Sequence, residues 1–282
     1  MDINQLRPMI EDINFNKSRC FPLYPHPILM IETSGYKNFL VISDIHIGLE
    51  DKIRRNGILI DPRQNIDESI KLLTNIHWET GVNELIILGD LKSSIRIITR
   101  TEWDNVPYFL ESLNKLFNVY LIPGNHDGNI KQLLPENVNL MRSKGIEFDN
   151  ILLTHGHTLP RIGMNVEKII VGHLHPIIQK EGSILQGNKI WVKINLTKKD
   201  LLEKNQKQNT RKLEIIIMPH FNNILDYYGK RNRNTSGTSG KSKLPLLDNM
   251  INRLNWSVEK AFLFTMDGSI IGSEVDLAEL LY

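Results

Sequence analysis

The sequence predicts an α/β fold in which two β-sheets pack against each other. In the first half of the chain, strand-length aliphatic runs alternate with stretches of helical spacing, and each run ends in a short polar segment. This alternation is typical of a layered α/β core whose functional site lies at the carboxyl ends of the strands. After residue 146, short apolar runs follow one another closely, which predicts a second, more antiparallel sheet packed on the first.

The first sheet is expected to contain buried strands over residues 38–42, 85–88 and 119–122. Apolar residues at helical spacing predict one helix over residues 65–79, which Gly81 ends, and a second over residues 106–117. The second sheet is expected from apolar runs at residues 151–153, 169–171, 177–178, 189–194 and 213–218. A hairpin over residues 261–271 and a short helix to Tyr282 are expected to follow.

The chain is expected to have four parts. Residues 1–36 contain a proline-rich stretch that favours extended or turn backbone, and they form an N-terminal extension that packs on the core. Residues 37–229 form the main domain. Residues 230–244 are expected to be a flexible linker, since they are almost entirely polar. Residues 245–282 form a C-terminal appendage that either completes the fold or makes a homodimer contact, and the sequence favours neither.

Composition excludes several classes of protein. A length of 282 residues with 41% hydrophobic residues allows a substantial core, and the net charge of +2 does not favour a protein that coats nucleic acid. The longest aliphatic runs are only strand-length, so no membrane span is expected. Polar residues interrupt the N-terminal region, so no secretory signal is expected. Cys20 is the only cysteine, which excludes an intrachain disulfide and favours a cytoplasmic location.

Candidate chemistry is concentrated in five polar segments that follow predicted strands. They hold six of the nine histidines, together with aspartate and asparagine. The segments are residues 43–46, 89–90, 124–127, 154–157 and 172–175. A lone buried histidine is more often a core residue than a ligand, but carboxylates, an amide oxygen and imidazoles at one set of strand ends are typical of a metal site. The ordered set therefore predicts such a site.

The types and spacing of these residues suit two divalent cations. Asp44 and His46 are two residues apart, so in extended backbone both side chains point the same way. Asp90 has two carboxylate oxygens and is able to bridge ions about 3.5–4 Å apart. Asn125 offers a neutral oxygen, and imidazole ligands are expected from His155, His173 and His175. Only one histidine of the 154–157 segment needs to bind, so His157 is a candidate substrate contact instead.

Two cations would allow hydrolysis at neutral pH. A water that bridges them loses a proton near pH 7 instead of about 15.7, which gives a hydroxide nucleophile. His126 follows Asn125 and is the candidate proton donor to the leaving alkoxide, with Asp127 expected to orient its other ring nitrogen. Arg54 and Arg55 lie close in sequence to the first segment and are candidate substrate-binding residues, with a solvated surface role as the alternative.

The ordered segments resemble the calcineurin-like metallophosphoesterase superfamily, whose motifs are D-x-H, G-D, G-N-H-D/E, H and G-H-x-H. All five motifs occur here in that order. The resemblance implies a four-layer αββα sandwich, a dinuclear site commonly active with manganese, and hydrolysis of phosphate esters, with His126 as the catalytic histidine. It also implies that one ion is held by Asp44, His46, Asp90 and His175, and the other by Asp90, Asn125, His155 and His173.

A narrower likeness is to bacterial ligase-associated DNA damage response phosphoesterases and their archaeal relatives. Residues 44–48 have their D-x-H-x-G form followed by basic residues and glycine, and residues 172–176 and 218–222 resemble their later motifs. One departure concerns the second motif. Many superfamily members carry a further Asp or His shortly after G-D, whereas this chain continues Leu91-Lys92-Ser93-Ser94. Substrate contacts near that segment are therefore expected to differ.

Taken together, the motifs predict a metal-dependent phosphoesterase that hydrolyses phosphodiesters through a metal-bridging hydroxide, with DNA or RNA as the favoured substrate and DNA repair as the implied context. The alternatives are a phosphomonoesterase, a phosphodiesterase of cyclic nucleotides or other small molecules, and a scaffold without turnover, against which the complete ligand set argues. Manganese is the favoured cofactor, but mixed nitrogen and oxygen ligands also accept iron, zinc, nickel and magnesium. No membrane partner is expected.

Overall fold

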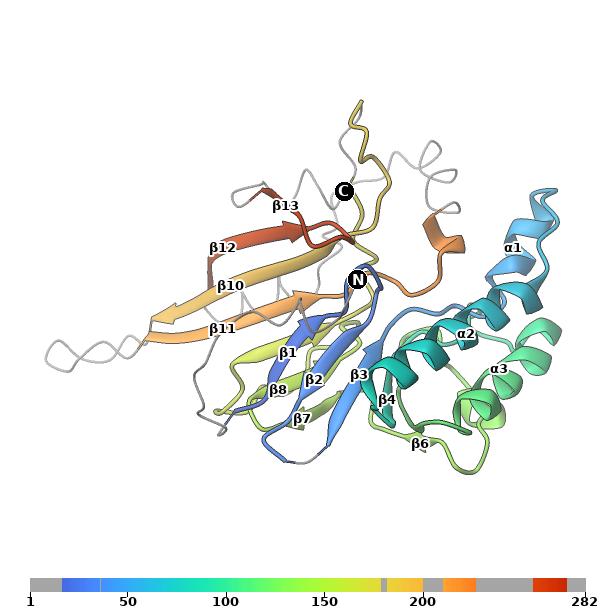
Figure 1. The fold of residues 1–282 in the computed structure, drawn as a ribbon, viewed down its shortest axis with the longest axis horizontal. Helices are drawn as coiled ribbons and strands as arrows, with labels where there is room; N and C mark the ends of the chain where they lie inside the picture. The colour runs from blue at the N-terminus through green and yellow to red at the C-terminus, as the bar shows by residue number, and fades with distance from the viewer. Residues whose placement is uncertain (1–16, 36, 179–181, 200–209, 227–255, 273–282) are drawn as a thin grey trace, which may run out of the picture.

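The computed structural model describes residues 17–35, 37–178, 182–199, 210–226 and 256–272 (Figure 1). Its first sheet has six strands in the order β1 (Arg19–Pro22), β2 (Leu29–Glu32), β3 (Asn38–Ile42), β4 (Glu84–Leu88), β5 (Asn118–Ile122) and β6 (Asn139–Leu140). Strands β1, β2 and β3 pair antiparallel, and β3 to β6 pair parallel. The parallel pairing brings the carboxyl ends of β3, β4 and β5 to one edge of the sheet.

Helices α2 (Pro62–Thr80) and α3 (Arg100–Leu113) lie along one face of this sheet (Figure 1). Helix α2 matches the predicted helix, and Gly81 ends it in the left-handed conformation as expected. Their apolar faces pack on the sheet in a core that includes Leu73, Ile76 and Phe109. Within the described ranges, no helix combines the length and the apolar character that a bilayer crossing requires.

The helices differ from the prediction in three respects, since α3 starts and ends earlier than residues 106–117 and α1 was not expected. Helix α3 begins at Arg100 instead of residue 106, because Thr99 and Glu102 form a reciprocal capping box that fixes an earlier start. The short helix α1 (Leu49–Arg55) was not predicted. It begins after Gly48, whose φ of 92° is left-handed and whose position offers no side-chain cap, so no helix start signal is present.

The second sheet contains seven strands. Their order is β13 (Ile270–Gly272), β12 (Ser257–Phe264), β10 (Trp191–Lys199), β11 (Thr210–Ile217), β9 (Lys168–Val171), β8 (Ile151–Thr154) and β7 (Ile146–Phe148). The pairs β11–β9 and β9–β8 are parallel and the others antiparallel, so the expectation of a more antiparallel second sheet is confirmed. The predicted C-terminal hairpin is the β12–β13 pair.

The other expectations for the second half of the chain are in part wrong and in part fall outside the described residues. The predicted strand over residues 177–178 is wrong, because Ile177 makes only an isolated bridge to Lys189. The expected linker over residues 230–244 and the helix to Tyr282 lie outside the described residues. The appendage from residue 245 contributes β12 and β13, which extend the second sheet beyond β10.

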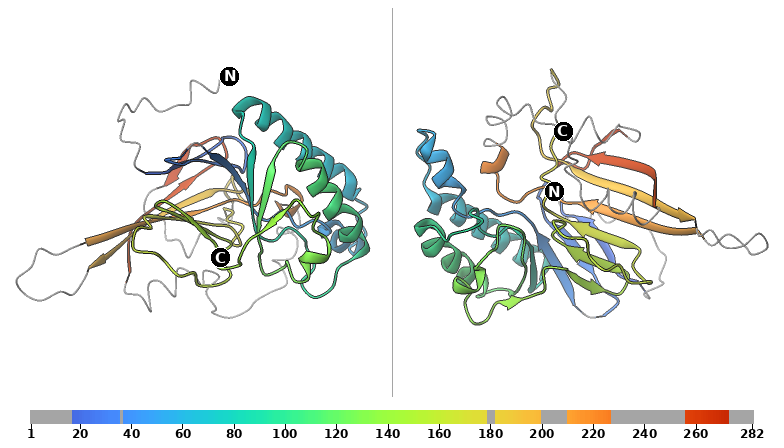
Figure 2. Two further views of the ribbon diagram at one scale, coloured as in Figure 1. Left: turned by 90° about the horizontal axis from the view of Figure 1, so that it is seen from below. Right: turned by 180° about the vertical axis from the view of Figure 1, so that it is seen from behind.

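The two sheets pack face to face through an apolar layer (Figure 2). Val41 and Leu88 from the first sheet and Leu153 and Trp191 from the second are completely or almost completely buried in this layer. The predicted fold class, α/β with two packed mixed sheets, is therefore confirmed. No α-helix in the described part of the chain lies on the outer face of the second sheet, so the second helical layer of the αββα sandwich remains a prediction.

Candidate metal centre

The structure brings the five polar segments together where strands of both sheets end. Asp44 follows β3 and Asp90 follows β4, and their segments are joined because the Asp44 N–H donates to the Gly89 carbonyl at 3.1 Å and the His46 N–H donates to the Asp90 carbonyl at 2.9 Å. The second sheet is tied to the first at the same place, since the His173 N–H donates to Asp44 Oδ2 at 3.0 Å. Segments far apart in the sequence therefore form one site.

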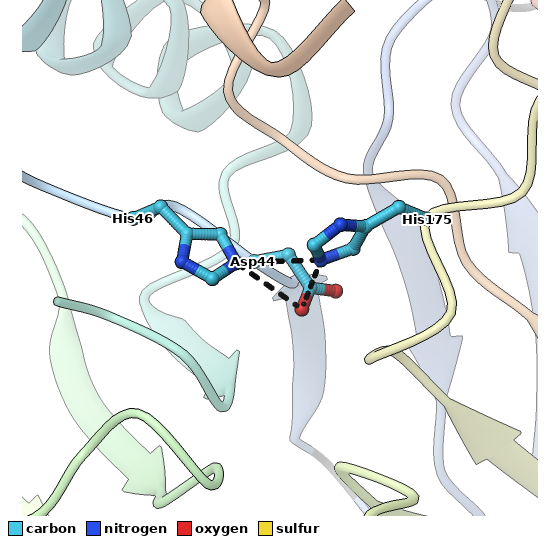
Figure 3. Close-up of side chains that lie close together, drawn as sticks. All are labelled: Asp44, His46 and His175. Carbon is cyan, nitrogen blue, oxygen red and sulfur yellow. Dashed lines mark hydrogen bonds and ion pairs between the residues drawn. The ribbon is translucent and has the colours of Figure 1, made fainter. Parts of the chain in front are cut away.

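One cluster of candidate ligands consists of Asp44, His46 and His175 (Figure 3). The two imidazole Nε2 atoms are 3.3 Å apart, and His175 Nε2 is 2.9 Å from Asp44 Oδ1. His46 Nε2 is 4.0 Å from the same oxygen. In Figure 3 the two rings approach this carboxylate from opposite sides, so three donor atoms converge on one point.

A second cluster consists of Asp90, His155 and His173, whose ligand atoms lie within 4.8 Å of one another. His155 Nε2 is 3.3 Å from Asp90 Oδ2 and 3.3 Å from Asn125 Oδ1. Asp90 Oδ2 is also 3.8 Å from His46 Nε2, which belongs to the first cluster. Asp90 therefore stands between the two clusters, where a bridging carboxylate is required.

These separations fit two bound cations. Nitrogen and oxygen donors that bind one ion at about 2.1 Å lie roughly 3–3.4 Å from one another. The distances from His175 to His46 and Asp44, and those from His155 to Asp90 and Asn125, fall in or beside this range. The protein thus holds its donors at spacings that suit ions without rearrangement.

Protonation state favours metal binding at two histidines, and ring orientation favours it at a third. Burial, reinforced by nearby histidines, lowers the pKa of His46 to about 3 and that of His173 to about 4, so both imidazoles are neutral at neutral pH. Burial also lowers the pKa of His155, but its hydrogen bond to Asp90, together with the charges of Asp44 and Asp90, outweighs burial and raises the pKa to about 9, so a cation that binds there must displace a proton. The His155 Nδ1–H donates to the Leu88 carbonyl at 2.8 Å, which aims Nε2 at the site.

The two carboxylates are ready to bind cations as well. Burial raises the pKa of Asp44, but the neighbouring His175 and two further histidines hold it well below its usual range. The same balance applies to Asp90: burial raises its pKa, whereas the hydrogen bond from His155 and the charges of His155 and His46 together lower it to about 2. Both side chains are therefore anions in a buried site, and a buried anion needs a cation or several donors beside it.

Five of the candidate ligands have strained backbone. Non-glycine residues rarely adopt positive φ, yet the φ angles of these ligands range from 45° to 68°. They are Asp44, His46, Asp90, His173 and His175. Strain of this kind costs about 1–3 kcal/mol per residue and is concentrated at functional sites, where surrounding contacts enforce it.

The glycines of the motifs are required by close approach. A Cβ on Gly124 would overlap Asp90 Oδ1 and lie 2.8 Å from His155 Nε2. A Cβ on Gly172 would overlap the Ser43 hydroxyl, and one on Gly89 would overlap the His155 ring. The backbone at these positions lies directly against the candidate ligands, which leaves no space for a side chain.

His126 lies at the mouth of the site with a side chain that is 19% exposed. Its Nδ1–H donates to the Ser93 carbonyl at 2.6 Å, and its Nε2 is 4.0 Å from Asp90 Oδ2. Its backbone N–H donates to Asp90 Oδ1 at 2.8 Å. The ring is therefore fixed on one side while Nε2 faces the candidate ligands, as a proton donor requires.

The prediction that Asp127 orients His126 is wrong. The Ser93 carbonyl occupies that position. The buried Asp127 carboxylate instead accepts backbone N–H groups of Leu91 at 2.9 Å, Lys92 at 3.2 Å and Gly124 at 2.7 Å. Burial, with the Asp90 charge, raises its pKa to about 6. Asp127 therefore links two site loops, and none of its hydrogen bonds in the described part of the chain reaches the His126 ring.

The candidate substrate residues lie at the periphery. Arg54 and Arg55 are exposed on the last turn of α1, and within the described residues neither forms a hydrogen bond or ion pair with the ligand clusters. His157 is half-buried, and its ring centroid is 5.4 Å from that of His155. Its Nδ1 is buried without a partner among the described residues, so His157 is available for a further contact at the rim.

Sequence reasoning missed the supporting residues after β11. The Phe221 N–H donates to the Ser43 carbonyl at 2.8 Å, and Asn222 Nδ2 donates to the Ile45 carbonyl at 2.7 Å. The buried His220 ring lies 5.5 Å from the His175 ring, and its Nε2 is 2.6 Å from Asp226. The likeness of residues 218–222 to a known motif was the available signal for this loop.

One family model matches the chain over the residues that carry the site. The family model described as calcineurin-like phosphoesterase matches residues 37–235, which is more than half of the chain. Among solved structures, the chain is similar to the nuclease MPE of Pseudomonas putida, with 15% identity, a TM-score of 0.45, and coverage of 88% of this chain and 98% of that chain. It is also similar to Yfce, a phosphoesterase from E. coli, with 16% identity, a TM-score of 0.36, and coverage of 84% and 97%. A search of curated proteins finds no match.

Proposed function

This chain belongs to the calcineurin-like phosphoesterase family of metal-dependent hydrolases, and on that premise we propose that it hydrolyses phosphodiesters of nucleic acid with two manganese ions. The observation that carries the proposal is the position of Asp90. Its carboxylate lies between two groups of histidines, and its Oδ2 is 3.3 Å from His155, 3.8 Å from His46 and 4.0 Å from His126. A shared carboxylate beside a proton donor is the arrangement that two-ion hydrolysis needs.

In this proposal, all candidate ligands have a place. One ion would be held by Asp44, His46, Asp90 and His175, and the other by Asp90, Asn125, His155 and His173. When bound, two divalent ions lower the pKa of a water molecule and offset the charge that builds up on the phosphate. Manganese is proposed because it accepts the mixture of imidazole, carboxylate and amide donors.

The protein supplies the proton for the leaving group. His126 donates Nδ1–H to the Ser93 carbonyl, so its Nε2 is the atom that faces a substrate. A proton on Nε2 passes to the alkoxide as the bond from phosphorus to the leaving oxygen breaks. General acid catalysis of this kind contributes about 10²–10⁴-fold to the rate.

Surface charge supports a nucleic acid substrate. Helix α1 starts within a few residues of His46 and ends with the exposed Arg54 and Arg55. Cationic side chains beside the site would bind the phosphates that flank the scissile one, which positions a strand without reading its sequence. The likeness of residues 44–48 and 172–176 to DNA damage response phosphoesterases supports the same substrate class. We also propose a cytoplasmic location, because a chain with one cysteine forms no intrachain disulfide and suits a reducing compartment.

The test is a substrate screen with the manganese-loaded protein. The substrates are single-stranded DNA, bis-p-nitrophenyl phosphate, p-nitrophenyl phosphate and cyclic nucleotides. We expect hydrolysis of DNA and of the diester, loss of activity with EDTA, and a decrease of about 10²-fold or more on DNA for His126→Ala. Hydrolysis of the monoester alone, or of cyclic nucleotides alone, would assign a small-molecule phosphoesterase, and no hydrolysis at all would favour a scaffold.

A further inference from the structure

We infer that Lys52 is a positioning residue for proton transfer by His126 and acts through the Ser93 carbonyl. The inference rests on the proposed function, because it assumes that His126 protonates the leaving group. Lys52 lies on α1 and is 41 residues from Ser93 in the sequence, so only the fold brings them together.

The Ser93 carbonyl accepts two hydrogen bonds. One comes from His126 Nδ1 at 2.6 Å and the other from the Lys52 ammonium at 3.0 Å. A carbonyl oxygen has two lone pairs, so both are in use. Since a carbonyl cannot donate, His126 must carry its proton on Nδ1 here, and the Lys52 bond fixes the direction in which the remaining lone pair faces the ring.

The segment around Ser93 is held from several sides. The Ser93 N–H donates to the Ile47 carbonyl at 2.9 Å, and the Ser94 N–H donates to Glu102 Oε1 at 2.6 Å. The buried Lys92 ammonium donates to the Ser94 carbonyl. These contacts fix the backbone of the segment, whereas Lys52 is the one side chain in the described residues that shares the acceptor with His126.

The position of Lys52 carries a desolvation cost for its ammonium group. Its side chain is partly buried, burial lowers the pKa of its ammonium group, and it forms no salt bridge with any residue that the structure describes. The charges of Glu102 and Asp90 act on the Lys52 ammonium from beyond salt-bridge distance, and a partly desolvated charge that forms no salt bridge contributes little to stability. Its position is better explained by its effect on the acceptor of His126.

The effect of losing the Lys52 hydrogen bond on the rate of cleavage depends on the leaving group. As the oxygen of a water molecule that has already lost one proton bonds to phosphorus, the bond to the leaving oxygen breaks and that oxygen takes the His126 proton. A nucleoside alkoxide needs this proton, whereas p-nitrophenolate leaves without it. A ring that is held less firmly would therefore slow the cleavage of poor leaving groups and spare good ones.

The experiment compares two thymidine diesters under manganese, the dinucleotide TpT and the p-nitrophenyl ester of thymidine 5′-phosphate. The variants are Lys52→Met, Lys52→Arg, His126→Ala and the matched control Lys71→Met, which removes an exposed lysine from α2. We expect Lys52→Met to lower kcat on TpT about 10-fold and on the nitrophenyl ester less than about 2-fold. Lys52→Arg keeps a charged donor and is expected to retain most of the activity on TpT.

A double variant completes the test. Lys52→Met in the His126→Ala background should have no further effect on TpT, since both changes remove the same contribution. An equal loss on both substrates, a loss no larger than that of Lys71→Met, or additive losses would each overturn the inference. If His126→Ala cleaves TpT as fast as the wild type does, His126 is not the proton donor and the inference is wrong. If the wild type cleaves neither diester, the proposed function itself is wrong. Thermal unfolding confirms that each variant is folded, and Lys52→Gln replaces Lys52→Met if the latter does not fold.

Discussion

Gly124→Ala tests whether the site is built around the shared carboxylate. The φ angle of Gly124 is not in the left-handed region, so the backbone accepts alanine, but the new Cβ would overlap Asp90 Oδ1 and lie 2.5 Å from the Asp90 N and 2.8 Å from His155 Nε2. Overpacking of this kind costs about 1–3 kcal/mol. At about 2–4 °C per kcal/mol for a chain of this size, the metal-free melting temperature should fall by roughly 2–12 °C.

The same substitution should weaken metal binding. An ion present at a hundredfold excess over its Kd stabilises the folded wild type by about 2.7 kcal/mol, which raises Tm by roughly 5–11 °C. Displacement of Asp90 in the alanine variant should remove most of this increase. The assay is thermal unfolding of both proteins in EDTA and in manganese.

Gly35→Ala is the matched control, since its Cβ would meet only Thr33 Oγ1 at 3.7 Å, an ordinary contact. It should unfold within about 1 kcal/mol of the wild type and keep the full manganese response. A Gly124→Ala protein that behaves in the same way as this control would refute the reasoning, because the carboxylate would then have room to move.

Four further substitutions test the described contacts and the burial of Cys20. Asp127→Asn should lower the free energy of unfolding by about 1–3 kcal/mol in denaturant titrations, because an amide cannot accept all three backbone N–H groups. His126→Ala, by contrast, should lower activity and change the free energy of unfolding little. Thr99→Ala should lower that free energy by about 0.5–2 kcal/mol through loss of the α3 capping box, and an unchanged midpoint would contradict the role of the cap. Burial raises the pKa of the Cys20 thiol from 9.0 to about 11, so the neutral thiol stabilises the folded state fully below pH 9 and this stabilisation is lost as the pH rises to 11. Relative to Cys20→Ala, the free energy of unfolding of the wild type should therefore fall by up to about 2–3 kcal/mol over that range. Parallel curves of stability against pH for the two proteins would exclude the effect.

The candidate ligands could be predicted from the sequence because they depend on strand ends. Asp44 and Asp90 directly follow buried aliphatic runs, and parallel pairing of β3 with β4 places such ends side by side. The start of α3 was also predictable in principle. Thr99 and Glu102 have the spacing of a capping box, and the apolar periodicity that begins at Val106 obscured this signal.

The partner of His126 could not be predicted from residue types. Asp127 is adjacent in sequence and carries a carboxylate, but the acceptor in the structure is the backbone carbonyl of Ser93. A carbonyl is present in every residue, so the sequence contains no signal for it. The contribution of Lys52 is hidden in the same way, because it depends on how the short helix α1 packs beside the 92–94 segment.

The strained ligands hold one another in place. The N–H of Asp44 and that of His46 both donate to the segment that carries Asp90, and the N–H of His173 donates to the Asp44 carboxylate. Each of these four residues has positive φ, which costs about 1–3 kcal/mol and persists only where neighbouring contacts enforce it. Because the contacts that enforce the strain come from the other ligands, loss of the Asp44 carboxylate would free the backbone of His173 as well as remove a donor atom. Substitutions of different ligands should therefore be far from additive in both metal affinity and stability.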